Sequence, residues 1–214
     1  MRYKVLALLA SMMFAGVAQA AHTDNGFYLG VDAGAANLMD KESHSVASES
    51  HQLAAAGPVF GAYLGYDYGI TNTFRLALEA FLDATWMQTS IQHAPNTYNM
   101  NQLYNMGIRL LPAYVFTAET TGHFIVGYTN GRFKIKDNGV YGMVNSTYNT
   151  CGLQFGFGAD TALINNFFVR LDALYDIYNS DTKTGTGLAP AASQFYTNRF
   201  SQLAGELSVY YKFA

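Results

Sequence analysis

The sequence contains little that could hold an exported protein together covalently or anchor it through a helix. Its 214 residues include one cysteine, Cys151, so no disulfide can form within the chain. After the N-terminal segment it has no run of about 18 apolar residues, which excludes a transmembrane helix. Charged residues make up only 13% of the chain and form no basic patch, so nucleic-acid binding is not expected.

The first twenty residues have the pattern of a secretory signal peptide. A positive start, Arg2 and Lys4, precedes a short apolar run at residues 5–14, and a small-x-small cleavage site ends at Ala20. An N-terminal membrane anchor fits less well, because the apolar run is too short to span a bilayer comfortably. We expect residues 1–20 to be removed and residues 21–214 to form one domain.

Aromatic residues and glycine are abundant instead, with 16 Tyr, 15 Phe and 20 Gly. Residues 73–88 show how they are arranged. Every second residue from Phe74 to Trp86 is apolar, while Arg75, Glu79 and Asp83 all lie on the other parity. Alternate side chains of a strand point to opposite faces, so this segment is predicted to be a strand with one apolar and one charged face.

The same alternation recurs and predicts eight strands, at residues 26–35, 59–69, 73–88, 102–116, 123–131, 150–162, 167–178 and 200–213. Short turns alternate with long polar loops, which we place at about residues 37–57, 89–101, 132–149 and 179–199. This arrangement is typical of an outer-membrane barrel. The predicted fold is all-β, an eight-stranded antiparallel up-and-down transmembrane β-barrel.

All charges within the predicted strands share one parity: Asp32, Asp67, Arg75, Glu79, Asp83, Arg109, Asp160, Arg170, Asp172, Asp176, Glu206 and Lys212. Most strand glycines lie on this parity too. Because the interior of an eight-stranded barrel is narrow, the small and charged residues are predicted to lie inside and the bulky apolar ones to face lipid. The competing fold is a soluble, lipocalin-like barrel with an apolar interior.

Aromatic residues cluster near both ends of the predicted strands, where a bilayer would have its interfaces. The expected interface residues are Phe27, Tyr68, Phe74, Tyr114, Phe124, Phe167, Tyr211 and Phe213 near the short turns, and Trp86, Tyr104, Tyr128 and Tyr178 near the long loops.

The strand segments GFYLGVDAG, PVFGAYLGYDYG, RLALEAF, FFVRLDALYD and LSVYYKF together resemble the small eight-stranded outer-membrane proteins of Gram-negative bacteria. The closest group is the opacity-protein/surface-antigen type, related to the membrane domain of OmpA. The resemblance implies a monomer in the bacterial outer membrane, inserted by the assembly machinery, with both termini in the periplasm and the loops outside. Phe213 matches the terminal aromatic insertion signal of such families, although Ala214 follows it.

Two functions follow from these expectations. The interior charges form either a salt-bridged plug or the gate of a narrow pore. The loops suit a structural or surface role, in contact with lipopolysaccharide or with a host surface ligand. An enzyme is not expected, because no strand displays His and Ser together on the lipid face. Nor does the sequence predict a cofactor or a metal site, since His44 and His51, with nearby Glu42 and Glu49, match no defined motif.

Overall fold

Nine β-strands surround one long interior in the computed structural model, which describes residues 25–44, 50–93, 96–139, 142–185 and 194–213. They are β1 (Gly26–His44), β2 (Ser50–Gly69), β3 (Phe74–His93), β4 (Asn96–Val115), β5 (Thr120–Gly139), β6 (Gly142–Ile164), β7 (Phe167–Tyr178), β8 (Asp181–Gly185) and β9 (Gln194–Lys212). The predicted signal peptide lies outside the described residues. Within those ranges, no helix has the length and apolar character needed to cross a membrane.

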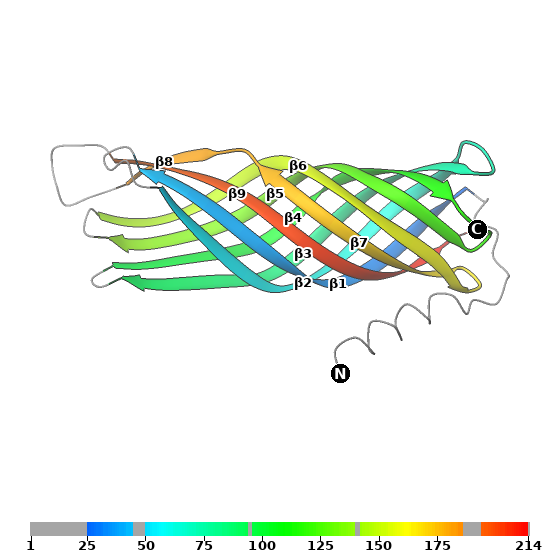
Figure 1. Cartoon of the computed structure of the whole chain (residues 1–214), viewed down its shortest axis with the longest axis horizontal. Helices are drawn as coiled ribbons and strands as arrows, with labels where there is room; N and C mark the ends of the chain where they lie inside the picture. Colours follow the sequence, from blue (N-terminus) through cyan, green and yellow to red (C-terminus); the bar gives the residue numbers. More distant parts are fainter. Residues whose placement is uncertain (1–24, 45–49, 94–95, 140–141, 186–193, 214) are drawn as a thin grey trace.

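Antiparallel pairing in chain order closes the strands into a barrel, because β1 also pairs with β9. β7 and β8 both pair with β9, one after the other along its length, so β8 continues the line of β7 after a break. The nine strands therefore occupy eight positions around the barrel, which confirms the predicted eight-stranded fold. Figure 1 shows them running along the long axis of the molecule.

The two faces of the barrel wall carry the residues that the alternation predicted for them. Apolar side chains such as Leu82 and Phe124 point outward and are 56% and 70% exposed, whereas Glu79 and Arg109 point inward and are 1% and 2% exposed. A wide apolar belt on the outside requires lipid. This arrangement excludes the alternative of a soluble barrel with an oily interior.

The interior has space for large side chains because cross-strand partners are often glycine. Gly65 lies opposite Tyr28, and Gly30 lies opposite Tyr63. A Cβ atom at either glycine would collide with the tyrosine ring. These pairs explain why glycine and tyrosine share the inward parity.

The four segments predicted to be long loops are mostly strand, and this prediction was wrong. β1 and β2 cover most of residues 37–57, β3 and β4 most of 89–101, β5 and β6 most of 132–149, and β8 and β9 about half of 179–199. We call the strand residues 37–44, 50–58, 86–93, 96–102, 132–139, 142–151, 181–185 and 194–200 the β-extension.

Side chains still alternate between inward and outward in the β-extension, but there the polar residues point outward and the apolar residues point inward. On β5, Tyr128 points outward from the apolar belt, whereas Arg132 and Lys134 point outward farther along the strand; Phe133 and Ile135 point inward and are at most 1% exposed. Outside the belt an outward side chain meets water rather than lipid, so the polar residues lie outside and the apolar ones inside. The polar residues predicted as loops are the outward face of these strands.

The ladder of the β-extension is divided into two lobes. Pairing of β2 with β3 stops at Val59 and Thr85, and pairing of β6 with β7 stops at Gly152 and Tyr178. Beyond these points β3–β6 form one sheet, lobe A, and β8, β9, β1 and β2 form another, lobe B. No ladder between the lobes is found in the described ranges of the extension.

Aromatic side chains pack the two lobes against each other. The ring of Phe200 in lobe B stacks on Phe133 of lobe A with centroids 4.2 Å apart, and it meets Tyr148 edge-on at 6.0 Å. The surrounding inward residues are equally buried. We call Leu38, Met87, Met100, Phe133, Ile135, Tyr148 and Phe200 the apolar cap.

Because the outer surface is apolar in the belt and polar in the β-extension, we expect a new outward charge to be destabilising in the belt and tolerated in the β-extension. Leu207→Arg places a charge in the middle of the apolar belt, and we expect it to lower the free energy of unfolding in lipid vesicles by about 2–4 kcal/mol. Thr147→Arg, outward on β6 in the β-extension, should change it by less than about 1 kcal/mol. Urea titration followed by heat-dependent gel migration measures both. Equal losses would contradict this expectation.

Candidate functional site

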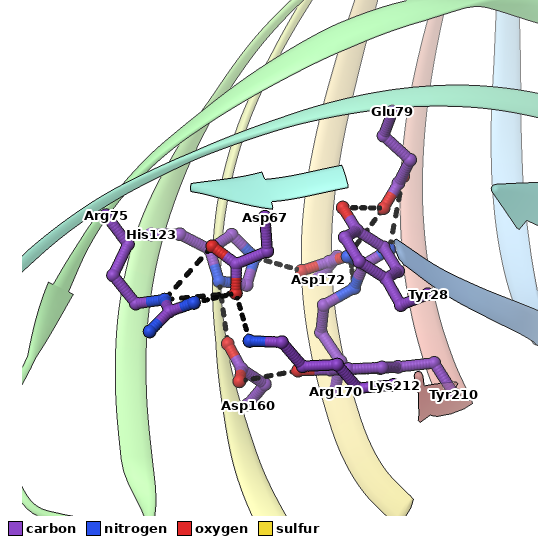
Figure 2. Close-up of polar contacts among 10 residues, drawn as sticks. All are labelled: Tyr28, Asp67, Arg75, Glu79, His123, Asp160, Arg170, Asp172, Tyr210 and Lys212. Atoms are coloured by element: carbon purple, nitrogen blue, oxygen red, sulfur yellow. Dashed lines mark hydrogen bonds and ion pairs between the residues drawn. The ribbon is translucent and has the colours of Figure 1, made fainter. Parts of the chain in front are cut away.

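The predicted interior charges come together inside the barrel, at the levels set by their positions along the strands. Eleven of the twelve are buried, and Asp67 is partly exposed near the short-turn end. Figure 2 shows how the groups nearest that end converge. The interior is therefore the candidate site, and its layers are described from the short turns upward.

The first layer is an ion cluster around Asp67. Arg75 Nε donates to Asp67 Oδ1 at 3.0 Å and its Nη2 donates to Oδ2 at 2.6 Å. Lys212 Nζ, from the last strand, also donates to Oδ2 at 2.9 Å. One carboxylate thus joins β2, β3 and β9 near the end of the barrel (Figure 2).

His123 lies between two further carboxylates, those of Asp160 and Asp172. Its Nδ1 lies 3.3 Å from Asp160 Oδ1 and its Nε2 lies 2.8 Å from Asp172 Oδ1. Tyr210 donates its hydroxyl to Asp160 at 2.9 Å. His123 was not predicted as an interior residue, because only Asp, Glu, Lys and Arg were counted as charges, although it has the parity of the inward residues on β5.

Glu79 is the centre of the second layer. Arg170 donates to it from Nη1 at 2.9 Å and from Nη2 at 3.3 Å, Arg109 donates from Nε, and Tyr28 donates its hydroxyl at 3.0 Å. Arg170 Nε also lies 3.0 Å from Asp172. Because charge-assisted bonds to a carboxylate are strong when water is excluded, this cluster ties β1, β3, β4 and β7 together.

Aromatic rings cover the two arginines of the second layer. The guanidinium of Arg170 lies 4.2 Å from the centroid of Tyr63, and that of Arg109 lies 4.9 Å from Phe81. Cation–π contacts of this kind stabilise a charge that is removed from water. In the sequence, Tyr63 and Phe81 have the same parity as the charged residues of their strands.

The third layer is acidic. Asp32 and Asp83 converge over Gly61, where a Cβ atom would collide with both carboxylates. Asp176 accepts a hydrogen bond from Asn105 at 3.4 Å, and Glu206 is 2% exposed. Four carboxyl groups therefore lie together at this level of the interior.

Above the acidic layer lies the apolar cap, and Tyr178 packs beneath it. Tyr178 was predicted to lie at the membrane interface, and this was wrong: it is 2% exposed and its ring lies 5.0 Å from Phe133 inside the barrel. Its parity on β7 is that of Arg170 and Asp172, so the alternation already indicated an inward position.

The other predicted interface aromatics point outward. Those with about half or more of their surface exposed are Phe27, Tyr68, Phe74, Trp86, Tyr114, Phe124, Tyr128, Phe167 and Phe213, while Tyr104 and Tyr211 are half-buried on the outer wall. Pairs of them touch edge-on, such as Phe74 and Tyr114 at 5.4 Å. Their role at the membrane interface remains our prediction.

A pocket lies in the interior near the short-turn end, lined among others by Asp67, Arg75, His123, Asp160 and Arg170. Above it, Arg109 and Arg170 meet Glu79 across the interior. Among the described side chains, no group of three or more His, Cys, Asp or Glu is arranged to hold a metal ion. The side chains of Glu42, His44 and His51 are not among those described.

The family model of the outer membrane protein beta-barrel domain matches residues 6–213. No curated protein sequence is similar enough to count as a relative. Solved structures share the fold at low identity. Neisserial surface protein A is 16% identical with a TM-score of 0.51, and the match covers 89% of this chain and 99% of that one.

Two further solved structures are less similar. The attachment invasion locus protein Ail of Yersinia pestis is 11% identical with a TM-score of 0.40, over 85% of this chain and 98% of that one. The outer membrane protease OmpT of Escherichia coli is 9% identical with a TM-score of 0.45, over 92% and 99%.

Glu79→Gln tests the central cluster. The change removes the charge that two buried arginines share, and we expect the free energy of unfolding to fall by about 3–5 kcal/mol. Urea titration in vesicles is the measurement. Glu119→Gln, the same change in the turn after β4, is the matched control and should stay within about 0.5 kcal/mol. If both variants lose the same stability, the cluster does not hold the barrel together.

Proposed function

The chain belongs to the outer membrane protein beta-barrel family of the bacterial outer membrane, and from this premise we propose that it is a non-conducting barrel that displays the β-extension for contact with other surfaces. The proposal has two parts. The interior acts as a plug rather than a gate, and the outward face of lobe B in the β-extension makes the contacts.

A chain of buried ion pairs across the interior carries the proposal. Contacts run without interruption from Asp160 through His123, Asp172 and Arg170 to Glu79, and Arg109 extends them to β4. The apolar cap, whose side chains are at most 1% exposed, lies above. A water path would have to break the buried ion pairs and also part the cap, and buried pairs are costly to break.

The build of the β-extension supports a role in surface contact. An apolar inside holds the strands together without lipid, so the outward residues are free to vary in chemistry. On lobe B, Lys41 and Ser43 of β1 lie opposite Arg199 and Thr197 of β9, and the four line a surface pocket. We propose that this cationic and hydroxyl-bearing pocket is part of the contact surface.

A narrow pore is the second candidate, and the acidic layer is the observation that favours it. Both carboxylate oxygens of Asp32 are buried without a hydrogen-bond partner among the described residues. Buried charges need partners, so water or cations in this layer would stabilise Asp32. A pore lined in this way would prefer cations.

Planar-bilayer recording separates the two candidates. After insertion has been verified by heat-dependent migration, we expect the protein to give no steps of conductance, while a water-filled porin reconstituted in parallel does. Cation-selective steps that become smaller in Asp32→Asn/Asp83→Asn would refute the plug and support the pore.

Attachment assays test the contact surface. We expect a Gram-negative strain that lacks the protein to bind epithelial cells severalfold better when it expresses the protein at its surface. Lys41→Ser/Arg199→Ser should remove most of the gain, because the pocket then loses both cations. The readout is the number of bound bacteria at matched surface expression.

Gln88→Ser/Thr147→Ser, on the outward face of lobe A, is the matched control and should attach like the unaltered protein. If expression does not raise attachment at all, the surface-contact proposal fails. If both double variants lose attachment equally, the contact is not made by lobe B.

A further inference from the structure

Three cationic residues point outward from consecutive outward positions of β5: Arg132, Lys134 and Lys136. They follow one another at every second residue, so their Cα atoms span about 13 Å along the strand. None of the three forms an ion pair with a carboxylate among the described side chains. The strand thus presents a line of three positive charges.

Amide and hydroxyl side chains surround this line on both neighbouring strands. The register places Arg132 between Tyr104 and Asn149, Lys134 between Asn101 and Thr147, and Lys136 between Asn99 and Asn145. All nine side chains are outward and at least partly exposed. We call these nine residues the β5 face.

The β5 face lies directly above the apolar belt. On the same side of β5, Tyr128 is 51% exposed within the belt, and Asn130 is the next outward residue. Arg132 therefore stands four residues, or about 13 Å along a tilted strand, beyond Tyr128. The belt residues Ile108 and Leu153 flank Tyr128 on β4 and β6. Going outward, the surface changes from aliphatic to amide to cationic.

We propose that the β5 face binds the phosphorylated glycolipid, lipopolysaccharide, that forms the outer leaflet of the same membrane. Arg and Lys are the residues that bind phosphate groups. The asparagine amides and the Thr147 hydroxyl both donate and accept hydrogen bonds, as sugar hydroxyls require. The aliphatic surface below receives the acyl chains.

The short distance between the β5 face and the apolar belt favours lipopolysaccharide of the same membrane over a sulfated glycan on another cell. A sulfated glycan on another cell would approach the far tip of the β-extension. The β5 face instead begins one outward residue beyond the belt, at the level of the lipid headgroups. Lobe B offers a comparison: its outward pair, Lys41 and Arg199, has no third cation in line among the described side chains.

The test uses the purified full-length mature protein in detergent and native mass spectrometry. The probes are bisphosphorylated lipid A bearing inner-core sugars, the same glycolipid after dephosphorylation, and heparin. We expect the phosphorylated glycolipid to bind tightly. Removal of its phosphates, or the variant Arg132→Gln/Lys134→Gln/Lys136→Gln, should weaken binding on the order of a hundredfold.

Lys41→Gln/Arg199→Gln is the matched control, which removes cations from the other lobe and should leave glycolipid affinity within about twofold. Two results would overturn the proposal. One is equal affinity for the phosphorylated and dephosphorylated glycolipid, which needs no variant and so holds even if the triple variant fails to fold. The other is tighter binding to heparin than to the phosphorylated glycolipid, which would assign the face to a glycan of another cell. The site does not depend on the proposed contact surface of lobe B.

Discussion

Closure of the ladder between β1 and β9 is the constraint on which the rest of this structure depends. Once every backbone group is paired around the barrel, each side chain has only two environments, the interior or the outside. The interior is the same narrow space at every level, whereas the outside changes from lipid to water. Within the belt, the outward positions are apolar and the inward ones are polar. Beyond it, the outward positions are polar and the inward ones are apolar. The change occurs near Tyr128 on β5 and at the corresponding level of the other strands.

The interior is built differently on the two sides of that level. Within the belt, where the outer surface must be apolar, polar side chains fill the barrel and bond to one another across many strands, with Glu79 accepting from both Arg109 and Arg170. Beyond the belt, the apolar cap does the filling. The first arrangement depends on ion pairs and hydrogen bonds, and the second depends mainly on apolar packing.

Much of this could be predicted from the sequence, and the failures have physical causes. The period-two alternation identified the eight strand positions and the inward charges. The pattern is strong there because every lipid-facing position is apolar. The β-extension was missed because its outward residues are polar and its inward ones are interrupted by Asp40 and Gln102, so the segments read as loops. His123 was left out of the charge count and Tyr178 was assigned by residue type alone, although the parity of each residue indicated an inward position.

The seams between the lobes have a consequence for how the surface can change over time. Within the barrel, a strand is held by hydrogen bonds on both edges, so insertions there break a ladder. Beyond Val59 and Thr85 the two sheets meet through side chains such as Phe133 and Phe200, and no backbone register binds one sheet to the other. Each hairpin can then lengthen, shorten or exchange its outward residues without shifting its neighbour across the seam. The closed ladder thus fixes the barrel, whereas the outward face of each lobe is not tied to the other lobe by a backbone register.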